Sequence, residues 1–351
     1  MRVLLTGIGG FIGTHCLEYY LDNTDWFIIG LDSWRHKGDY RRIEDVISPE
    51  KLKKHKDRFV LYKHDLSVPI TPQLINLIGE KQINQHGIVV EKPINMIINM
   101  ASDSAVERSN TDPTFCLRNN FEIIVNMLEY ARICKPKIFF QVSTDEVYGQ
   151  AEPGQFHKEW DKIVPSNAYA ASKAAQEAVA ISYWRAFNVP VVLTNSINNF
   201  GEGQDPEKFI PKIISSIISG KTMPIYGDSV DSIGKRFYLH AKNHADVFLF
   251  LSKFAPTMYD GGQNQLPDRY NIGSNVELSN LAIAEYVANC LDKELQWKLV
   301  PSEIARKGYD KRYALDSSKL SSLGWKPPID FEFSLRNVID WTLKYRNWSI
   351  S

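Results

Sequence analysis

The sequence has no excess charge and no compositional extreme that would place it outside the ordinary globular class. Lysine plus arginine number 41 and aspartate plus glutamate also number 41, so the formal net charge is zero. A dedicated nucleic-acid binder usually has a strong basic excess, and the charge balance argues against that class. Hydrophobic residues make up 44% and charged residues 23% of the chain, as is typical of a folded globular protein.

Cysteine pairs, long apolar runs and metal-binding spacings are absent from the sequence as well. The four cysteines, Cys16, Cys116, Cys134 and Cys290, are widely spaced, which favours reduced thiols in a reducing compartment. No segment approaches the roughly 20 apolar residues that span a membrane, and the first residues are too short an apolar run for a signal peptide. The histidines show no spacing such as HExxH. We therefore expect a cytoplasmic protein without metal, nucleic-acid partner or membrane association.

The first half of the sequence alternates short apolar runs with segments of helical periodicity. The apolar runs lie at residues 2–6, 27–32, 59–64, 96–100, 138–143 and 191–195, and long helical patterns lie at 119–134 and 168–187. This alternation predicts a parallel sheet with helices on both faces. Ligands bind at the carboxyl ends of the strands in such sheets, so we expect the functional site there.

The alternation loosens after residue 195, where helices are expected near 210–219, 280–291 and 331–345. We therefore predict an α/β protein with a Rossmann-type doubly wound parallel sheet and a smaller C-terminal substrate-binding domain. The large domain is assigned residues 1–195 with about 236–262, and the smaller domain about 196–235 with 263–351.

A glycine-rich loop directly follows the first predicted strand and opens a helix. It reads Thr6-Gly7-Ile8-Gly9-Gly10-Phe11-Ile12-Gly13. Gly7, Gly10 and Gly13 permit a tight turn, the close approach of a pyrophosphate and close packing of helix on strand. The helix that follows presents free N–H groups and the positive end of its dipole to that pyrophosphate. The sequence therefore predicts a dinucleotide site.

The residues at the ends of the second and third strands bear on the choice of dinucleotide. Asp32 can accept hydrogen bonds from an adenosine ribose and would repel a 2′-phosphate, which favours NAD over NADP. Arg35, His36 and Lys37 are nearby cations that could instead receive a 2′-phosphate. Asp65-Leu66 could hold the adenine edge, or could form a plain turn at the end of a strand.

Tyr169 and Lys173 lie four residues apart and therefore on one face of a predicted helix. A tyrosine hydroxyl ordinarily has a pKa of about 10. A neighbouring ammonium and a cationic nicotinamide would lower the pKa of Tyr169 and let it remove the proton of a substrate hydroxyl. Thr144, at the end of a predicted strand, can hydrogen-bond the same substrate oxygen.

Asp145 and Glu146 follow Thr144 and add a second acid/base function. Two neighbouring carboxylates repel each other, so one can stay protonated near neutral pH while the other is ionised. The elimination of water needs such a pair, with a base for a C–H proton and an acid for the leaving hydroxyl. A solvated acidic turn is the alternative interpretation of this pair.

Taken together, these motifs resemble those of the extended short-chain dehydrogenase/reductase family, and within it the dTDP-glucose 4,6-dehydratase group. The resemblance extends over nearly the whole chain, including Asn198-Asn199-Phe200-Gly201, Tyr270-Asn271-Ile272-Gly273 and Arg312-Tyr313-Ala314. Its most specific part is Thr144-Asp145-Glu146, because related epimerases lack the acidic pair and related decarboxylases share only the glutamate.

The resemblance implies an NAD-dependent hydro-lyase that acts on a nucleotide-activated hexose. Tyr169 would deprotonate the C4 hydroxyl as hydride passes to NAD, with Thr144 and Lys173 assisting. Glu146 would then remove the C5 proton while Asp145 protonates the departing C6 hydroxyl. Return of the hydride to C6 gives a 4-keto-6-deoxy sugar, whereas return to C4 would leave a 5,6-alkene. The nucleotide (dTDP, UDP, GDP or CDP), the hexose and the pathway stay open.

The resemblance also implies binding residues and a homodimer formed through the two long helices. From the pattern alone, the apolar surface of these helices could instead belong to the core. The residues implied for the cofactor are Gly7, Gly10, Phe11, Ile12, Gly13, Asp32, Asp65, Leu66, Ala101, Ser143, Tyr169, Lys173 and Asn198. Those for the substrate are Ser104, Arg108, Asn199, Lys208, Pro224, Tyr226, Arg236, Asn271, Arg306 and Tyr309. Arg236 and Arg306 are expected to bind the pyrophosphate, because guanidinium groups match phosphate oxygens.

Departures from the family pattern, which also occur at 236–238 and 306–310, and two alternative functions complete the interpretation. Ala105 stands where the family commonly has histidine, and Glu107 where it has aspartate, so Ala105 is expected to leave room for a bulkier sugar. A sugar-nucleotide 4-epimerase would share the cofactor and Tyr169 but would not need Asp145 or Glu146. A non-catalytic NAD-binding sensor would need none of the catalytic residues.

Overall fold

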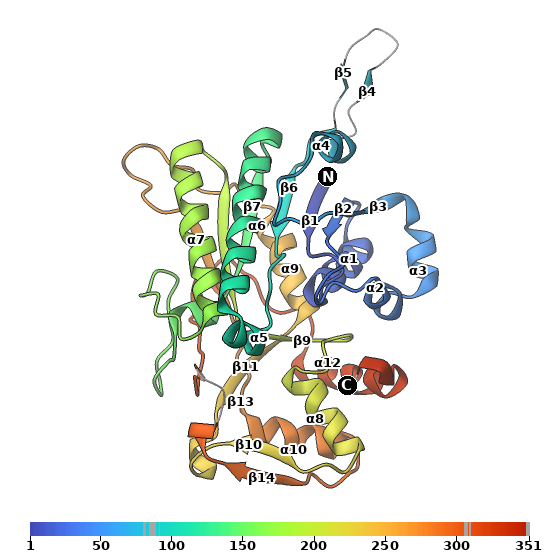
Figure 1. Cartoon of the computed structure of the whole chain (residues 1–351), viewed down its shortest axis with the longest axis vertical. Helices are drawn as coiled ribbons and strands as arrows, with labels where there is room; N and C mark the ends of the chain where they lie inside the picture. The colour runs from blue at the N-terminus through green and yellow to red at the C-terminus, as the bar shows by residue number, and fades with distance from the viewer. Residues whose placement is uncertain (80–81, 84–88, 91, 305–307, 309, 349–351) are drawn as a thin grey trace.

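The structure is a computed structural model that describes residues 1–79, 82–83, 89–90, 92–304, 308 and 310–348. A large α/β part forms the upper two thirds of the molecule in Figure 1, and a smaller part containing β10, β14, α8 and α10 lies below it. None of the described helices combines the length and the apolar character needed to cross a membrane.

The large part is built on a seven-stranded sheet with the order β12-β8-β7-β6-β1-β2-β3. All neighbouring strands of this sheet are parallel. The strands are β1 (Arg2–Thr6), β2 (Phe27–Asp32), β3 (Phe59–Lys63), β6 (Met96–Asn99), β7 (Ile138–Thr144), β8 (Val191–Ser196) and β12 (Asp268–Ile272). The predicted Rossmann-type doubly wound sheet is confirmed.

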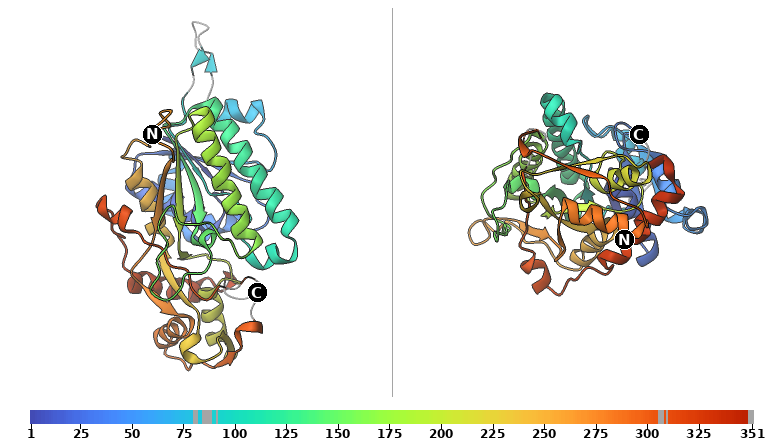
Figure 2. Two further views of the ribbon diagram at one scale, coloured as in Figure 1. Left: turned by 90° about the vertical axis from the view of Figure 1, so that its left-hand side faces the viewer. Right: turned by 90° about the horizontal axis from the view of Figure 1, so that it is seen from below.

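Helices cover both faces of this sheet, and alternate strand residues supply the two cores. On one face, Leu4 and Phe139 pack with side chains of α4 (Pro72–Gly79), α6 (Pro113–Cys134) and α7 (Ala168–Phe187). On the other face, Leu5 packs with side chains of α1 (Phe11–Asn23), α2 (Tyr40–Val46), α9 (Ala241–Leu251) and α11 (Ser318–Ser322). The long helices α6 and α7 run side by side in Figure 2.

The smaller part has a hydrophobic core of its own, formed largely by α8 (Phe209–Ile218), α10 (Asn280–Cys290) and α12 (Phe331–Lys344). Its two-stranded parallel sheet pairs β10 (Met223–Tyr226) with β14 (Trp297–Val300). A three-stranded sheet of β13 (Glu277–Ser279), β11 (Lys235–His240) and β9 (Asn198–Phe200) lies between the two parts. The remaining elements are α3 (Pro49–Lys54), α5 (Val106–Thr111), β4 (Gln82–Ile83), β5 (Val89–Val90) and five short 3₁₀ turns.

Two strands lie elsewhere than the domain assignment from the sequence implied. Strand β12 was assigned to the smaller domain, but it pairs with β8 and forms an edge of the central sheet. Strand β11 was assigned to the large domain, but it pairs with β9 and β13 instead. Strand pairing is decided by partners distant in sequence, so periodicity predicts a strand but not the sheet that it joins.

The two long helices begin where local capping signals lie. Helix α6 starts earlier than the predicted residue 119, because the Asp112 side chain accepts a hydrogen bond from the Phe115 N–H at 3.0 Å and Pro113 occupies the first turn. Helix α7 begins after Asn167, whose side chain accepts a hydrogen bond from Ala170 N–H. It matches the predicted range 168–187, with Asn188 in a left-handed conformation at its end.

Candidate active site

A cavity of about 550 Å³ lies at the carboxyl ends of the central strands and extends toward the smaller part. All of the predicted catalytic residues line it, namely Thr144, Asp145, Glu146, Tyr169 and Lys173. The predicted cofactor residues also line it, namely Gly7, Gly10, Phe11, Ile12, Gly13, Asp32, Asp65, Leu66, Ala101, Ser143 and Asn198. The fold therefore brings together residues that are up to 191 positions apart.

The glycine loop forms a close-fitting backbone turn at one end of the cavity. Gly7 has a φ of +71°, a conformation that glycine adopts readily. A Cβ atom at Gly13 would lie 2.1 Å from the Gly7 carbonyl oxygen, so a side chain there would collide with the loop. Helix α1 begins at Phe11 without a side-chain cap at Gly10. Its first N–H groups thus face the cavity as donors for an anion.

Asp32 joins the glycine loop to the residues that follow β2. Its carboxylate accepts hydrogen bonds from the backbone N–H groups of Gly9 and Trp34, both at 2.9 Å. Burial raises the pKa of Asp32 above its ordinary value, and these two backbone donors counteract that effect. The side chain fixes the loop and still lines the cavity, where lone pairs remain available to a ribose hydroxyl.

The three basic residues that follow Asp32 each contact another side chain of the protein. Arg35 forms an ion pair with Asp65 at 2.6 Å, and Lys37 forms one with Glu207 at 2.9 Å. The His36 ring nitrogen Nδ1 lies 2.8 Å from a guanidinium nitrogen of Arg108. Arg35 and Lys37, which the sequence offered as acceptors for a 2′-phosphate, are thus already matched by carboxylates. This arrangement favours a dinucleotide without that phosphate.

Asp145 and Glu146 stand next to each other in unlike environments. Asp145 is 3% exposed and accepts a hydrogen bond from Thr144 Oγ1 at 3.1 Å. Burial and the nearby charge of Glu146 raise the pKa of Asp145 to about 7. Glu146 is less buried, and its Oε2 accepts a hydrogen bond from Asn167 Nδ2 at 2.9 Å. At neutral pH, Asp145 can therefore carry a proton.

Tyr169 and Lys173 lie on one face of α7 at the cavity wall, as predicted, but the charge environment differs from the expectation. Burial and the charges of Glu146 and Asp145 raise the pKa of Tyr169 above its ordinary value. Burial lowers the pKa of Lys173 to about 8. Lys173 Nζ donates a hydrogen bond to Gln176 Oε1 at 2.6 Å. Without the cofactor, the pKa of Tyr169 is therefore raised and not lowered as expected.

Most of the predicted substrate residues also line the cavity, and they come from both parts of the chain. They are Ser104, Asn199, Lys208, Pro224, Tyr226 and Arg236. The Arg236 guanidinium donates hydrogen bonds to the backbone carbonyls of Asp310 and Lys311 and lies over the Tyr313 ring. The predicted residues Arg306 and Tyr309 lie outside the described residues.

Three residues singled out in the sequence do not line the cavity. Asn271 is buried behind it, where its side chain accepts from Tyr148 Oη at 3.1 Å and donates to the His157 carbonyl at 2.8 Å. Arg108 points to Asp103, with which it forms an ion pair at 2.5 Å. Ala105 is buried at the start of α5, so the hypothesis that it enlarges the sugar site is not supported. Asn271 and Arg108 thus have structural partners where the sequence predicted substrate contacts.

Two residues near the carboxyl pair were missed by the site prediction. Tyr313 lines the cavity, and its hydroxyl lies 3.5 Å from Glu146 Oε2 while donating to Asp310 at 2.9 Å. The Arg312-Tyr313-Ala314 motif was noticed in the sequence and could have signalled it. Asn167 does not line the cavity, and its side chain donates a hydrogen bond to Glu146. The part of the chain that the structure describes contains no cluster of His, Cys, Asp and Glu suited to a metal ion.

Comparison with known proteins agrees with this geometry. The family model described as GDP-mannose 4,6 dehydratase matches residues 4–338. The chain belongs to this family. It is 32% identical to the low-salt glycan biosynthesis protein Agl12 of Haloferax volcanii, over 98% of this chain and 99% of the relative. It is 30% identical to the dTDP-glucose 4,6-dehydratase of Haemophilus influenzae, over 98% of each chain.

A solved structure extends the comparison to three dimensions. The dTDP-glucose 4,6-dehydratase of Streptomyces venezuelae, solved with NAD bound, is 28% identical with a TM-score of 0.80 and covers 99% of this chain and 98% of that chain. The resemblance to the dTDP-glucose 4,6-dehydratase group that the motifs predicted is therefore confirmed.

Proposed function

We propose that this family member is an NAD-dependent hydro-lyase that dehydrates a nucleotide-activated hexose by 4,6-elimination. The observation that carries the proposal is the pair of adjacent carboxyl groups in unlike environments. Asp145 is buried with its pKa raised to about 7, whereas Glu146 is more exposed and bonded to Asn167. Elimination of water needs one proton donor and one proton acceptor, and these two residues meet that need in a single cavity.

The end of the cavity formed by the glycine loop fits NAD. The Gly7–Gly13 backbone leaves space for a pyrophosphate at the start of α1, and Asp32 is available to the ribose. The carboxylates paired with Arg35 and Lys37 favour NAD over NADP. Bound NAD would supply a hydride acceptor for the C4 carbon and the hydride that is returned after water is lost.

The residues of the chain divide the proton transfers between them. Tyr169 is assigned the removal of the C4 hydroxyl proton, with Thr144 hydrogen-bonded to the same oxygen. Because the pKa of Tyr169 is raised in the protein alone, its deprotonation depends on cations supplied by Lys173 and the bound nicotinamide. Glu146 is assigned the C5 proton, which the neighbouring ketone acidifies. Asp145 is assigned proton donation to the departing C6 hydroxyl.

The two parts of the molecule are assigned different ligands. We propose that the large part binds NAD and that the smaller part binds the nucleotide of the sugar through Lys208, Tyr226 and Arg236. A product that retains the hydride at C6 is the expected outcome, giving a 4-keto-6-deoxy sugar. The dTDP-glucose 4,6-dehydratase relatives support dTDP-hexoses as the first substrates to test.

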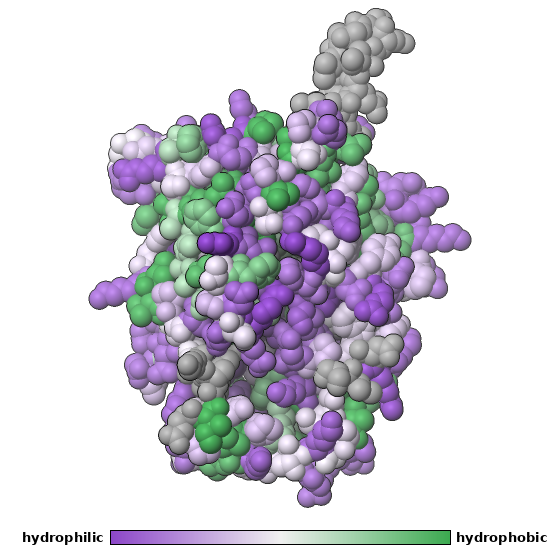
Figure 3. All heavy atoms as spheres, viewed as in Figure 1, coloured by the Kyte–Doolittle hydropathy of each residue, from purple (hydrophilic) through white to green (hydrophobic). Residues whose placement is uncertain are grey.

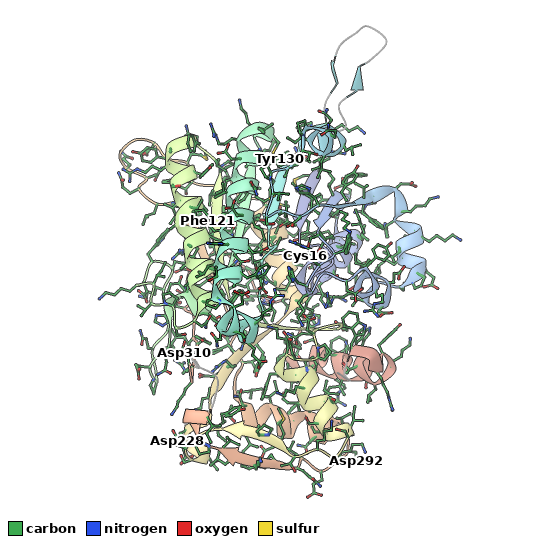
Figure 4. The ribbon with its side chains drawn as sticks, in the orientation of Figure 1. Cys16, Phe121, Tyr130, Asp228, Asp292 and Asp310 are labelled. Carbon is green, nitrogen blue, oxygen red and sulfur yellow. The ribbon has the colours of Figure 1, made fainter. Side chains whose placement is uncertain are left out.

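We also propose that two copies of the chain associate through α6 and α7. Apolar side chains gather over these helices on the face shown in Figure 3. Phe121, which is labelled on α6 in Figure 4, is 44% exposed, and Leu117 and Phe187 are exposed as well. Exposed apolar residues on two adjacent helices are typical of a subunit interface.

The test is mass spectrometry of the purified protein after incubation with dTDP-, UDP-, GDP- and CDP-hexoses. Dehydration predicts a product lighter by about 18 mass units that disappears in a Glu146→Gln variant. The substrate that gives this product identifies the nucleotide and the sugar. Unchanged mass with a new sugar isomer would contradict the proposal and indicate a 4-epimerase. No product from any donor, despite bound NAD, would contradict catalysis on these substrates and favour a sensor.

A further inference from the structure

Asn167 connects two predicted catalytic elements without belonging to the cavity wall. It is 8% exposed and does not line the cavity. It occupies the N-cap position of α7, two residues before Tyr169, with extended backbone angles. Its side chain also reaches Glu146, 21 positions earlier in the sequence. One amide group therefore links the start of the helix that bears Tyr169 to the carboxylate proposed as the base.

The orientation of the Asn167 amide is fixed by its two partners. Its Oδ1 accepts a hydrogen bond from the Ala170 backbone N–H at 2.9 Å. Its Nδ2 donates to Glu146 Oε2 at the same distance of 2.9 Å. Rotating the amide by half a turn would set two donors against each other and two acceptors against each other. Only one orientation satisfies both contacts, so the cap also fixes the direction of the hydrogen bond to Glu146.

The other side chain beside Glu146 Oε2 is a weaker donor. The Tyr313 hydroxyl lies 3.5 Å from that oxygen, and its single proton is directed to Asp310 Oδ2 at 2.9 Å. Ser166, the residue before Asn167, also donates to Asp310 Oδ2, at 2.5 Å. Asp310 is labelled in Figure 4 below the lower ends of α6 and α7. Its carboxylate thus accepts the hydrogen bonds of both neighbouring hydroxyl groups. Among the described side chains, Asn167 makes the shorter hydrogen bond to Glu146.

We infer that Asn167 is a positioning residue that holds the Glu146 carboxylate toward C5 of the substrate. The inference rests on the proposed function, because it assigns Asn167 a role through the proposed base. A hydrogen-bonded carboxylate keeps one rotamer. Its position beside Asp145 matters as well, because the charge of Glu146 contributes to the raised pKa of Asp145. The same amide caps α7 and thereby fixes Tyr169 relative to Glu146.

Variants of Asn167 can separate the cap from the hydrogen bond to Glu146. Serine is a good N-cap residue, so Asn167→Ser keeps the cap and removes the donor. Asn167→Asp keeps the cap and sets a like charge against Glu146. Asn167→Ala removes both functions. As a matched control, Asp330→Ala removes the N-cap of α12, where Asp330 Oδ1 accepts a hydrogen bond from Phe333 N–H and the side chain does not line the cavity.

The kinetic experiment measures kcat and KM of water loss, together with solvent-deuterium incorporation at C5. For Asn167→Ser we expect an unchanged thermal midpoint, an unchanged KM and a kcat lower by about 10- to 100-fold, the usual effect of losing a hydrogen bond to a charged group. Deuterium incorporation should slow by the same factor, while oxidation at C4, followed by nicotinamide absorbance, stays within about 2-fold. Asn167→Asp should show a larger decrease of kcat. Asp330→Ala should lower the thermal midpoint and leave kcat unchanged.

A structural measurement tests the inference even if the proposed function fails. Failure of the wild-type protein to dehydrate any sugar nucleotide would overturn the proposed function by itself. Crystal structures of the wild type and of Asn167→Ser would still report the position of Glu146. We expect one Glu146 rotamer in the wild type and a displaced or multiple rotamer in the variant. An unchanged Glu146 rotamer, or full activity in Asn167→Ser, would show that Asn167 is only a helix cap.

Discussion

The two ends of the cavity are built by different physical means. At the glycine-loop end the wall is backbone, its shape depends on missing side chains, and the exposed cations Arg35 and Lys37 are matched by carboxylates. At the catalytic end the wall is made of side chains, and Asp145 and Lys173 are almost completely buried with shifted pKa values. Steric fit determines what the glycine-loop end can bind, whereas the local environment of each titratable group determines the protonation states at the catalytic end.

This contrast teaches why the two ends tolerate change differently. A side chain added at the glycine loop collides with backbone, which cannot rearrange cheaply. Replacing a charged side chain at the catalytic end by a neutral one of the same shape leaves the cavity intact. It removes a group that could donate or accept a proton.

Asp145→Asn should lower the rate of water loss by about 10²- to 10⁴-fold, the usual contribution of a general acid or base. The amide keeps the shape of the carboxyl group but cannot donate the same proton to the leaving hydroxyl. Affinity for NAD, measured by isothermal calorimetry, should stay unchanged, because Asp145 is not among the residues assigned to the cofactor. A matched Glu50→Gln variant on the exposed surface of α3 should behave as the wild type. Weakened NAD binding in Asp145→Asn would contradict the separation of the two ends.

Glu177→Gln should destabilise the fold by about 3–5 kcal/mol, because it leaves the buried Arg269 guanidinium without its counter-ion. Both side chains are fully buried and form an ion pair, and Glu177 Oε1 also accepts from Asn195 Nδ2, which in turn donates to the Thr144 carbonyl. Urea unfolding gives the free energy. The double variant Glu177→Met, Arg269→Leu should be less destabilised than Glu177→Gln. An equal or larger loss in the double variant would contradict the argument.

Gly13→Ala should destabilise the protein by about 1–3 kcal/mol and weaken NAD binding by at least about 10-fold, because its Cβ would overlap the Gly7 carbonyl and displace the loop. The Cβ–oxygen distance of 2.1 Å is far below a normal contact. Gly262→Ala is the control, since a Cβ at Gly262 meets no atom within 4 Å. Thermal unfolding with and without NAD measures both effects. Equal behaviour of the two variants would mean that the loop tolerates displacement.

The rate of water loss should decrease as the pH rises through about 7, the raised pKa of Asp145. The active form of a general acid is the protonated one, and the fraction of protonated Asp145 falls above its pKa. Oxidation at C4 does not use this proton, so its rate, followed by nicotinamide absorbance, should not fall in the same window. A profile of water loss that rises through pH 7 would contradict the assignment of Asp145 as the acid.

Lys37→Ala should have the smallest effect, below about 1 kcal/mol on stability and below about 5-fold on NAD affinity. Its ion pair with Glu207 is exposed to water, where such pairs contribute little. The variant should still discriminate against NADP, because Asp32 remains. Competition binding of NAD and NADP provides the measurement. A large gain in NADP affinity or a large loss of NAD affinity would show that Lys37 contacts the cofactor directly.

Much of the large part was predictable from the sequence because its signals are local. Apolar runs gave the positions of β1 and β2, and capping residues bound α7 on both sides. The motif residues Gly7, Asp32 and Tyr169 could be found because Gly7 follows β1, Asp32 ends β2 and Tyr169 lies in the first turn of α7, each in a recognisable sequence context. These features depend on neighbours within a few positions.

Other features could not be predicted because they depend on contacts distant in sequence. Strand β12 joins the central sheet through pairing with β8, more than 70 positions earlier. Asn271 belongs to a recognisable motif, yet its side chain forms hydrogen bonds with Tyr148 and the His157 carbonyl and does not line the cavity. Asn167 carries no catalytic signal in the sequence, and its contact with Glu146 exists only because α7 packs beside the end of β7.

The sequence by itself determined the fold class, the family and the identity of the carboxyl pair, because residue types and their spacing carry that information. Only the tertiary structure decided which carboxyl group is the buried one. Burial is a property of the packed molecule, and together with the nearby charge of Glu146 it raises the pKa of Asp145, while Asn167 donates a hydrogen bond to Glu146. The proposed assignment of Asp145 as the acid and Glu146 as the base rests on this difference between their environments.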